Sequence, residues 1–143
     1  DDWVVGGKDQ DRLAGDEGND IVFGNLGDDT LDGGAGNDLV RGGQGNDVMA
    51  GGAGDDFMSG DRGDDTMSGG GGADTFNSFG EAGIDRVLDF SRAEGDRVRL
   101  EPGSTWTASQ IDADTVVDIT GGGKVILVGV TLSGLSDGWI FVG

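Results

Sequence analysis

A nine-residue unit repeats eight times in phase between Gly6 and Asn77, and this period constrains the fold more than any other feature of the chain. Position one of the unit is always glycine, position six is always aspartate and position eight is always apolar. The glycines are Gly6, Gly15, Gly24, Gly33, Gly42, Gly51, Gly60 and Gly69. The aspartates are Asp11, Asp20, Asp29, Asp38, Asp47, Asp56, Asp65 and Asp74. The apolar residues are Leu13, Val22, Leu31, Val40, Met49, Met58, Met67 and Phe76. Three invariant positions in eight copies indicate a repeat architecture rather than a chain that is merely rich in Gly and Asp.

The spacing within one unit predicts a turn followed by a short strand. Glycine at positions one, usually two, and four allows positive φ through the turn, so that several carbonyls can face one point. Where position two is not glycine it is Asp16, Asn25 or Asp61, residue types that tolerate a left-handed backbone. The last three residues of each unit are predicted to form the strand, with position eight pointing inward and positions seven and nine outward.

The oxygen content of this turn favours a hard cation. Calcium takes six to eight oxygen ligands, from carboxylates and carbonyls together, in a loose geometry. A coil of two units buries only two position-eight side chains, whereas fixing its many glycines is entropically costly and stacking its carboxylates is repulsive. We therefore expect that the array does not fold without a cation.

The unit resembles the GGxGxDxUx nonapeptide of RTX proteins, and the resemblance implies an all-β fold. In that family, two units make one coil of a parallel β-roll (β-helix), and calcium lies between vertically adjacent turns along two edges. The resemblance places Asp11, Asp29, Asp47 and Asp65 on one edge, and Asp20, Asp38, Asp56 and Asp74 on the other. It implies about six calcium ions, the first weakened because Asp9 replaces the position-four glycine.

In the family each ion also takes backbone carbonyls, from positions one and three of one turn and from positions two and four of the next. The first set corresponds here to Gly6, Lys8, Gly15, Glu17, Gly24, Leu26, Gly33, Ala35, Gly42, Gln44, Gly51 and Ala53. The second set corresponds to Asn25, Gly27, Gly34, Gly36, Gly43, Gly45, Gly52, Gly54, Asp61, Gly63, Gly70 and Gly72.

Composition excludes several function classes. The formal net charge is -19, which argues against nucleic acid and anionic membranes as partners and predicts disorder in the calcium-free state. No apolar run reaches transmembrane length. With no His and no Cys, a Ser or Cys nucleophile lacks its usual base. Acidic pairs such as Asp28 with Asp29 recur with the period and are interpreted as metal loops, so the fragment itself is not expected to be an enzyme. A parent domain upstream could be a hydrolase or an epimerase.

After Asn77 the phase slips by two residues, and Gly80 to Leu88 fits a degenerate ninth unit. We expect a calcium-binding β-roll over residues 1–88 and a C-terminal β capping segment over 89–143, because the end of an open roll needs a cover. Strands are predicted at Thr115–Thr120, Lys124–Val130 and Trp139–Val142. Further core residues are predicted to be Phe90, Val98, Leu100, Trp106 and Trp139, with Asp89 and Asp96 as turn and cap residues.

The C-terminal stretch resembles the end of type I secretion substrates, with Asp137 before a final apolar run. The resemblance implies a secreted, extracellular protein, with the type I secretion machinery as a partner, whose repeats are disordered at cytosolic calcium and fold outside the cell. The alternative is a polysaccharide-binding module or a cell-surface (S-layer) anchor. Against a polyanionic glycan, Arg12, Arg41 and Arg62 are scattered in the sequence.

One outward ladder of side chains is not explained by the repeat. Position-seven residues at eighteen-residue spacing read Trp3, Ile21, Leu39, Phe57 and Thr75. A contiguous apolar stripe of this kind predicts a contact, with an upstream domain, a second copy or the chain's own C-terminal strands. Because Asp1 and Asp2 fall in phase at positions five and six of a preceding unit, we expect the chain to be a fragment of a longer protein.

Overall fold

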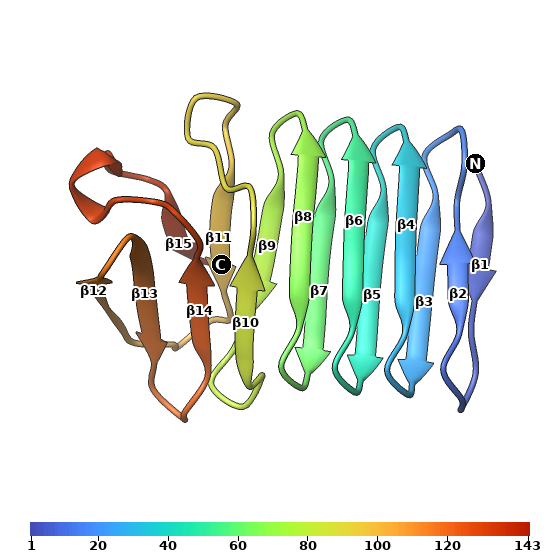
Figure 1. Cartoon of the computed structure of the whole chain (residues 1–143), viewed down its shortest axis with the longest axis horizontal. Helices are drawn as coiled ribbons and strands as arrows, with labels where there is room; N and C mark the ends of the chain where they lie inside the picture. Colours follow the sequence, from blue (N-terminus) through green and yellow to red (C-terminus); the bar gives the residue numbers. More distant parts are fainter.

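The computed structural model describes all residues from Asp1 to Gly143 and consists almost entirely of β-strands. From residue 3 to residue 100 the chain winds as a flattened coil, alternating strand by strand between two sheets that face each other (Figure 1). The first sheet has the order β1-β3-β5-β7-β9-β11-β15, and the second has the order β12-β13-β14-β10-β8-β6-β4-β2. Neighbouring strands of the repeat are parallel, which confirms the parallel β-roll.

The strands of the repeat are β1 (Trp3–Val5), β2 (Arg12–Ala14), β3 (Ile21–Leu26), β4 (Thr30–Ala35), β5 (Leu39–Gln44), β6 (Val48–Ala53), β7 (Phe57–Arg62), β8 (Thr66–Gly71) and β9 (Thr75–Ser78). Those that follow are β10 (Ile84–Val87), β11 (Arg97–Leu100), β12 (Trp106–Ile111), β13 (Asp114–Ile119), β14 (Lys124–Leu127) and β15 (Ile140–Val142). The only helical element is the 3₁₀ turn η1 (Leu132–Gly134), and no helix in the chain has the length and apolar character needed to cross a membrane.

The register confirms two units per coil. In the first sheet Trp3 pairs with Ile21, Ile21 with Leu39, and Leu39 with Phe57. In the second sheet Arg12 pairs with Thr30, and the same eighteen-residue step continues to Thr66. Side chains therefore stack directly above their equivalents in the next coil.

The repeat strands are longer than predicted, at six residues in β3 to β8 rather than three. The extra residues are positions one to three of the following unit, of which positions two and three pair with the same positions of the neighbouring coil. The predicted turn conformation is present inside these strands, because Asn25 in β3 and Asp61 in β7 have φ values of 82° and 71°, and Asp16 after β2 has 72°. Pairing between stacked turns thus extends the ladder through residues that local patterns assign to a turn.

The core is a single file of position-eight side chains between the two sheets. Val22, Val40 and Met58 are fully buried, and Phe76 is the last position-eight residue of the eight units in this row. The three methionines of the repeat lie in this core, as predicted. Leu13 in the first coil is only partly buried, because fewer coils cover it.

The strands from β10 onward prolong both sheets. β10 lies beside β8, β11 lies beside β9, and β14 and β15 add further parallel strands. Phe90, Val98, Leu100 and Trp139 are buried in the same core, as predicted. The boundary at residue 88 remains a prediction.

Several details of this segment differ from the predictions. The hairpin strand β12, which pairs antiparallel with β13, was not predicted. The first predicted strand is shifted by one residue, to Asp114–Ile119, and the last loses Trp139 and begins at Ile140. β14 ends at Leu127 rather than Val130, because Gly129 takes a φ of 72° and turns the chain.

The core assignment of Trp106 is wrong. It lies on the sheet-edge strand β12 and is 37% exposed, touching Trp139 edge to face with ring centroids 5.9 Å apart.

Candidate metal centre

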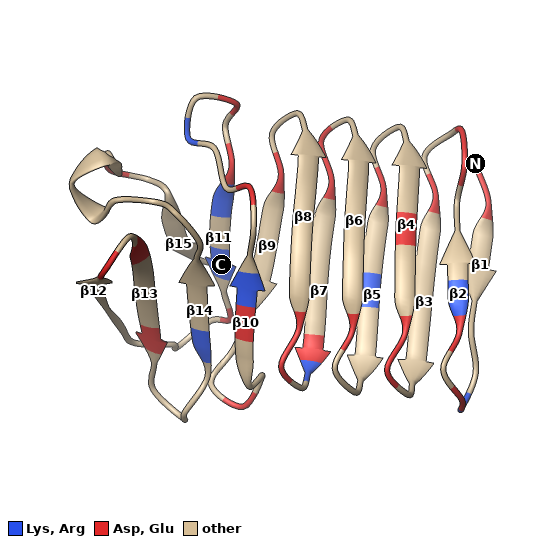
Figure 2. Cartoon of the chain, in the orientation of Figure 1, with Lys and Arg blue, Asp and Glu red and all other residues tan.

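The position-six aspartates form two columns, one along each edge of the roll. In one column the backbone N–H of Asp29 donates to Oδ1 of Asp47 at 2.8 Å, and Asp47 repeats this bond to Asp65. In the other column Asp20 donates to Asp38 and Asp38 to Asp56, at 2.7 and 2.8 Å. Acidic segments accordingly recur at the turns along both edges (Figure 2). The two edges implied by the family resemblance are present.

The second oxygen has no partner in seven of the eight column carboxylates. These seven aspartates are buried, and their Oδ2 atoms are solvent-inaccessible and accept no hydrogen bond. These orphaned atoms belong to Asp20, Asp29, Asp38, Asp47, Asp56, Asp65 and Asp74. A buried carboxylate oxygen without a donor is costly, and a cation is the usual means of satisfying several such atoms at once.

The position-one glycines leave space for these oxygens. A Cβ on Gly33 would lie 2.6 Å from Asp38 Oδ2 and 2.5 Å from the carbonyl oxygen of Gly51 in the next coil. A Cβ on Gly6 would likewise meet Asp11 Oδ2 at 2.6 Å and the Gly24 carbonyl at 2.7 Å. A position-six carboxylate and a position-one carbonyl therefore both point into the space beside the glycine, where any other residue would place its Cβ. Both are members of the ligand set that the family resemblance implies.

Burial also raises the pKa values of the column carboxyls. It raises the pKa of Asp56 and Asp65 to about 7, and of Asp47 and Asp74 to about 6. In each case the backbone N–H bond from the preceding coil opposes the effect of burial, and repulsion from the stacked carboxylates adds to it. The columns therefore resist carrying their negative charge unless a positive charge balances it.

The remaining carbonyls of the predicted ligand set take part in contacts between coils. Position-three carbonyls accept the position-four N–H of the preceding coil, as Ala35 does from Gly18 and Ala53 from Gly36, both at 2.8 Å. The position-two carbonyl of Asp16 accepts the Ala35 N–H at 2.7 Å. A carbonyl has a second lone pair, so these bonds leave ligand capacity.

The columns end where groups of the protein occupy the carboxylates. Oδ2 of Asp11 accepts the Gly7 N–H at 2.7 Å, and Asp11 is more exposed than the aspartates that follow it. Oδ2 of Asp96, which continues the Asp74 column, accepts the Ser91 N–H at 2.8 Å. Oδ2 of Asp85 accepts the Ser78 hydroxyl at 2.9 Å, while its Oδ1 remains unpartnered.

A second ladder at position five was not anticipated from the sequence. The side-chain oxygen of Asn19 accepts the Asn37 N–H at 2.7 Å, and Asn37 in turn accepts from Asp55 at 2.9 Å. On the other edge Asp28 accepts from Asn46, and Asn46 accepts from Asp64, both at 2.8 Å. The signal was visible as Asn or Asp at most position-five sites, but an exposed residue beside a metal loop has no evident need for a partner.

The donor set contains only oxygen. Nowhere do three or more acidic side chains gather closely enough to hold a cation by themselves, so the carboxylates of each column need carbonyls to complete a site. An all-oxygen set of carboxylates and carbonyls in a glycine-rich turn suits calcium better than metals that prefer nitrogen or sulfur. The residues present therefore fit calcium.

Comparison with known proteins agrees with this geometry. The sequence matches the RTX calcium-binding nonapeptide repeat family in four overlapping copies, over residues 1–31, 14–49, 23–58 and 41–76. The chain belongs to this family, whose repeats bind calcium. It is an RTX repeat module. No curated protein matches the sequence.

Two solved repeat subunits share the fold. The AlgE6R3 subunit of the Azotobacter vinelandii mannuronan C5-epimerase is 27% identical, with a TM-score of 0.64 over 94% of this chain and 80% of that one. The AlgE6R2 subunit of the same enzyme is 24% identical, with a TM-score of 0.60 over 97% of this chain and 91% of that one. The extracellular lipase LipA from Serratia marcescens is 19% identical with a TM-score of 0.48, and the match covers 99% of this chain and 40% of the lipase.

Proposed function

We propose that this chain is a calcium-dependent folding module, disordered without calcium and folded into the roll when calcium binds. The observation that carries the proposal is the set of seven buried Oδ2 atoms without partners, stacked in two columns. Desolvated like charges at this spacing oppose folding, and divalent cations remove the opposition. The free energy of calcium binding is then part of the free energy of folding, because the site does not exist in the unfolded chain.

The ligand assignment follows the columns. Calcium would be held between Asp20 and Asp38 and at the next two steps along that column, and in the other column between Asp29, Asp47 and Asp65, together with the carbonyls of positions one to four. The step from Asp11 to Asp29 would be weaker, because the Gly7 N–H occupies Asp11 Oδ2. This is the set of about six ions expected from the repeat, with one site weakened.

The proposed setting is a protein exported by a type I secretion system. A disordered acidic chain can be threaded through an export channel, and extracellular calcium modules typically bind at about 10⁻⁴ to 10⁻³ M, far above cytosolic calcium. Residues 89–143 would then act both as the cap on the last coil and as the segment that resembles a secretion signal. Occurrence in a secreted, extracellular protein is part of the same proposal.

A calcium titration followed by circular dichroism tests the proposal. A chain freed of divalent ions should lack the β-type signal and gain it cooperatively at about 10⁻⁴ to 10⁻³ M calcium. Magnesium at equal concentration is the matched control, and it should not substitute, because it demands a smaller and more regular octahedral site. A β-rich, compact chain in excess chelator at about pH 8, where the column carboxyls are ionised, would refute the proposal.

A polysaccharide-binding or surface-anchoring role is the second candidate, and one observation favours it. The interpretation of the arginines as scattered is wrong for two of them, because Arg41 and Arg62 line one groove together with Arg99. Arg12 lies apart, on β2 of the other sheet.

Docking on the apolar ladder remains a prediction. Ile21, Leu39 and Phe57 are half-buried on the outer face of the first sheet, and Trp3 is 71% exposed. The C-terminal strands continue the sheets edge to edge, so they leave an upstream domain or a second copy as the candidate partners.

A further inference from the structure

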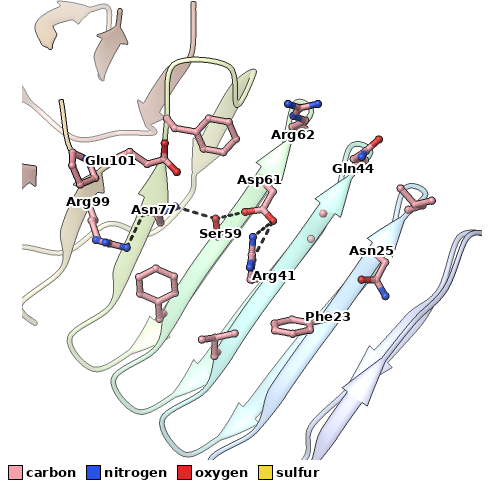
Figure 3. A pocket seen from close by; sticks show the side chains of 17 residues that line it. Phe23, Asn25, Arg41, Gln44, Ser59, Asp61, Arg62, Asn77, Arg99 and Glu101 are labelled. Atoms are coloured by element: carbon pink, nitrogen blue, oxygen red, sulfur yellow. Dashed lines mark hydrogen bonds and ion pairs between the residues drawn. The ribbon is translucent and has the colours of Figure 1, made fainter. Parts of the chain in front are cut away.

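A groove crosses the outer face of the first sheet and reaches the turns beside the Asp47 column, since a Cβ on its lining residue Gly42 would meet Asp47 Oδ2. It has a volume of about 900 Å³ and runs over β3, β5, β7, β9 and the start of the segment after β11 (Figure 3). Gly42 and Gly43 lie in its lining, and Phe79 and Pro102 contribute from the connections that follow β9 and β11. A groove of this volume can accommodate several units of an extended ligand.

A chain of hydrogen bonds links side chains across four strands of this groove. Arg41 donates through Nε and Nη2 to Oδ2 of Asp61, at 3.1 and 2.6 Å. The Ser59 hydroxyl donates to Asp61 Oδ1 at 2.7 Å, and Asn77 Nδ2 donates to the Ser59 hydroxyl at 3.2 Å. Arg99 Nη1 lies 3.4 Å from Asn77 Oδ1. The polar groups are thus held in place before any ligand arrives.

These residues depart from the repeat. Position two is glycine at Gly34, Gly43 and Gly52, whereas Asp61 holds the same left-handed turn with a φ of 71°, which disfavours a side chain. The Asp61 carboxylate points to Arg41 and Ser59 and not to a metal column. A roll built only to bind calcium has no need of this network.

The charge of the groove is opposite to that of the rest of the chain. Three of the nine basic residues line it, against two acids, Asp61 and Glu101, in a chain of net charge -19. Arg99 forms no ion pair, and Arg62 approaches only the exposed Glu81, at 3.8 Å. The guanidinium of Arg99 lies over the Phe57 ring at 5.8 Å and that of Arg41 over Phe23 at 5.9 Å. The Phe57 ring orients Arg99, which forms no ion pair and keeps N–H groups available for an anion, whereas Nε and Nη2 of Arg41 already donate to Asp61.

We propose that this groove binds an extended glycan that carries carboxylates, such as a chain of uronic acids. Guanidinium groups pair with carboxylates in a planar, two-point fashion, and the amides of Asn25, Gln44 and Asn77 supply the donors and acceptors that sugar hydroxyls need. This inference rests on the second candidate function above and gives that function its ligand class.

An acidic peptide fits the groove less well. Extended peptides are usually recognised by adding a strand to a free sheet edge, through backbone hydrogen bonds. The groove instead lies on the face of a sheet whose backbone already pairs within the sheet on both sides, between β5 and β7 and between β7 and β9. Only side chains remain to make the contacts, as in sites for sugars.

Isothermal titration in saturating calcium tests the proposal, with galacturonate hexamer as the carboxylated probe. Neutral cello-hexaose and a hexaglutamate peptide are the comparison ligands. Arg99→Gln and, separately, Arg62→Gln should each weaken galacturonate binding roughly tenfold, because each removes a charged hydrogen-bond donor. Arg62 is exposed, so its variant keeps the test valid should Arg99→Gln perturb the fold. Arg12→Gln is the matched control on the other sheet and should leave binding unchanged.

The outcomes separate this inference from calcium-dependent folding. Circular dichroism first confirms that each variant folds with calcium, so absent galacturonate binding by a folded chain overturns the groove proposal alone. Equal weakening by Arg12→Gln would overturn it by showing non-specific attraction or calcium bridging. Equally tight binding of cello-hexaose or hexaglutamate would overturn the ligand class. A chain that dimerises through this face, with Arg62→Gln breaking the dimer in sedimentation runs, would assign the groove to a second copy instead.

Discussion

The repeat array and the segment that follows it use aspartate in opposite ways. In the array, a column carboxylate such as Asp38 accepts one backbone N–H and leaves its other oxygen buried without a partner. In the later segment, Asp96 accepts N–H groups from both Asp74 and Ser91. Asp89 accepts from Gly69 N–H, Gly70 N–H and the Ser68 hydroxyl. Aspartate oxygens thus lack a hydrogen-bond partner in the array, whereas protein donors supply the partners in the later segment.

The two regions also differ in how much apolar surface supports them. Each coil of the array contributes one position-eight side chain from each sheet, whereas the C-terminal segment adds Val98, Leu100, Val117, Leu127 and Trp139 to the core. Under the proposed function, the array needs an external cation to satisfy its carboxylates, whereas the segment after it is held by contacts within the protein. The Asp74 column stops at Asp96, because backbone N–H groups of the protein bond both oxygens of that carboxylate.

Removing the C-terminal segment should have the largest effect. A chain that ends at Leu88 lacks β11, which pairs with β9, and lacks the side chains that cover Phe76. An array with an uncovered end propagates poorly, so we expect this chain to stay disordered at about 10⁻³ M calcium by circular dichroism. Folding at the same calcium concentration as the full chain would show that residues 89–143 do not serve as a cap.

Central and terminal carboxylates should differ in importance. Asp47→Ala removes a buried carboxylate that faces both Asp29 and Asp65, whereas Asp11→Ala removes a partly exposed one whose second oxygen already has the Gly7 N–H. The calcium midpoint should rise roughly tenfold for Asp47→Ala and far less for Asp11→Ala, with a shallower transition in the first case. Equal shifts in parallel titrations would be incompatible with stacked sites.

Acidification should partly replace calcium in the array. Burial raises the pKa of Asp56 and Asp65 to about 7, and of Asp47 and Asp74 to about 6, in the folded chain. A folded-state pKa above the unfolded value gives stability that is fully present below the unfolded pKa and is lost as pH rises through the folded one. The calcium-free chain should therefore gain β-structure as pH falls from about 8 to about 5. Circular dichroism in metal-free buffer checks this, and structure that instead increases with pH would contradict the origin of the shifts.

Asp89 should contribute a smaller amount to stability. Its carboxylate closes the last turn at Gly69 and Gly70, so Asp89→Ala leaves several donors unsatisfied and should cost about 1 to 3 kcal/mol in calcium-saturated unfolding by denaturant. Asp137→Ala is the control, because Asp137 is exposed. If both variants unfold at the same denaturant concentration, Asp89 has no closing role.

Much of this fold could be predicted because the repeat encodes it locally. The left-handed turn at Asp61, the inward file from Val22 to Phe76 and the eighteen-residue register all follow from positions within the unit. The extended six-residue strands could not, because they arise from pairing between coils. The same holds for the position-five ladder at Asn37 and for β12, whose exposed residues carry no clear alternating pattern.

The groove was missed for a related reason. Arg41, Arg62 and Arg99 are 21 and 37 residues apart in sequence, and only the register of β5, β7 and β11 brings them to one face. Spacing in the sequence alone does not show that these arginines lie close together in the fold.

Amide hydrogen exchange with and without calcium tests the central claim most directly, because the column amides of Asp29, Asp38, Asp47 and Asp56 each donate to a carboxylate of the next coil. If calcium holds the coils together, these four amides are protected in saturating calcium and exchange at the rate of an unfolded chain when calcium is chelated. Protection that persists in excess chelator would show that the roll stands without the ion, and would contradict the account.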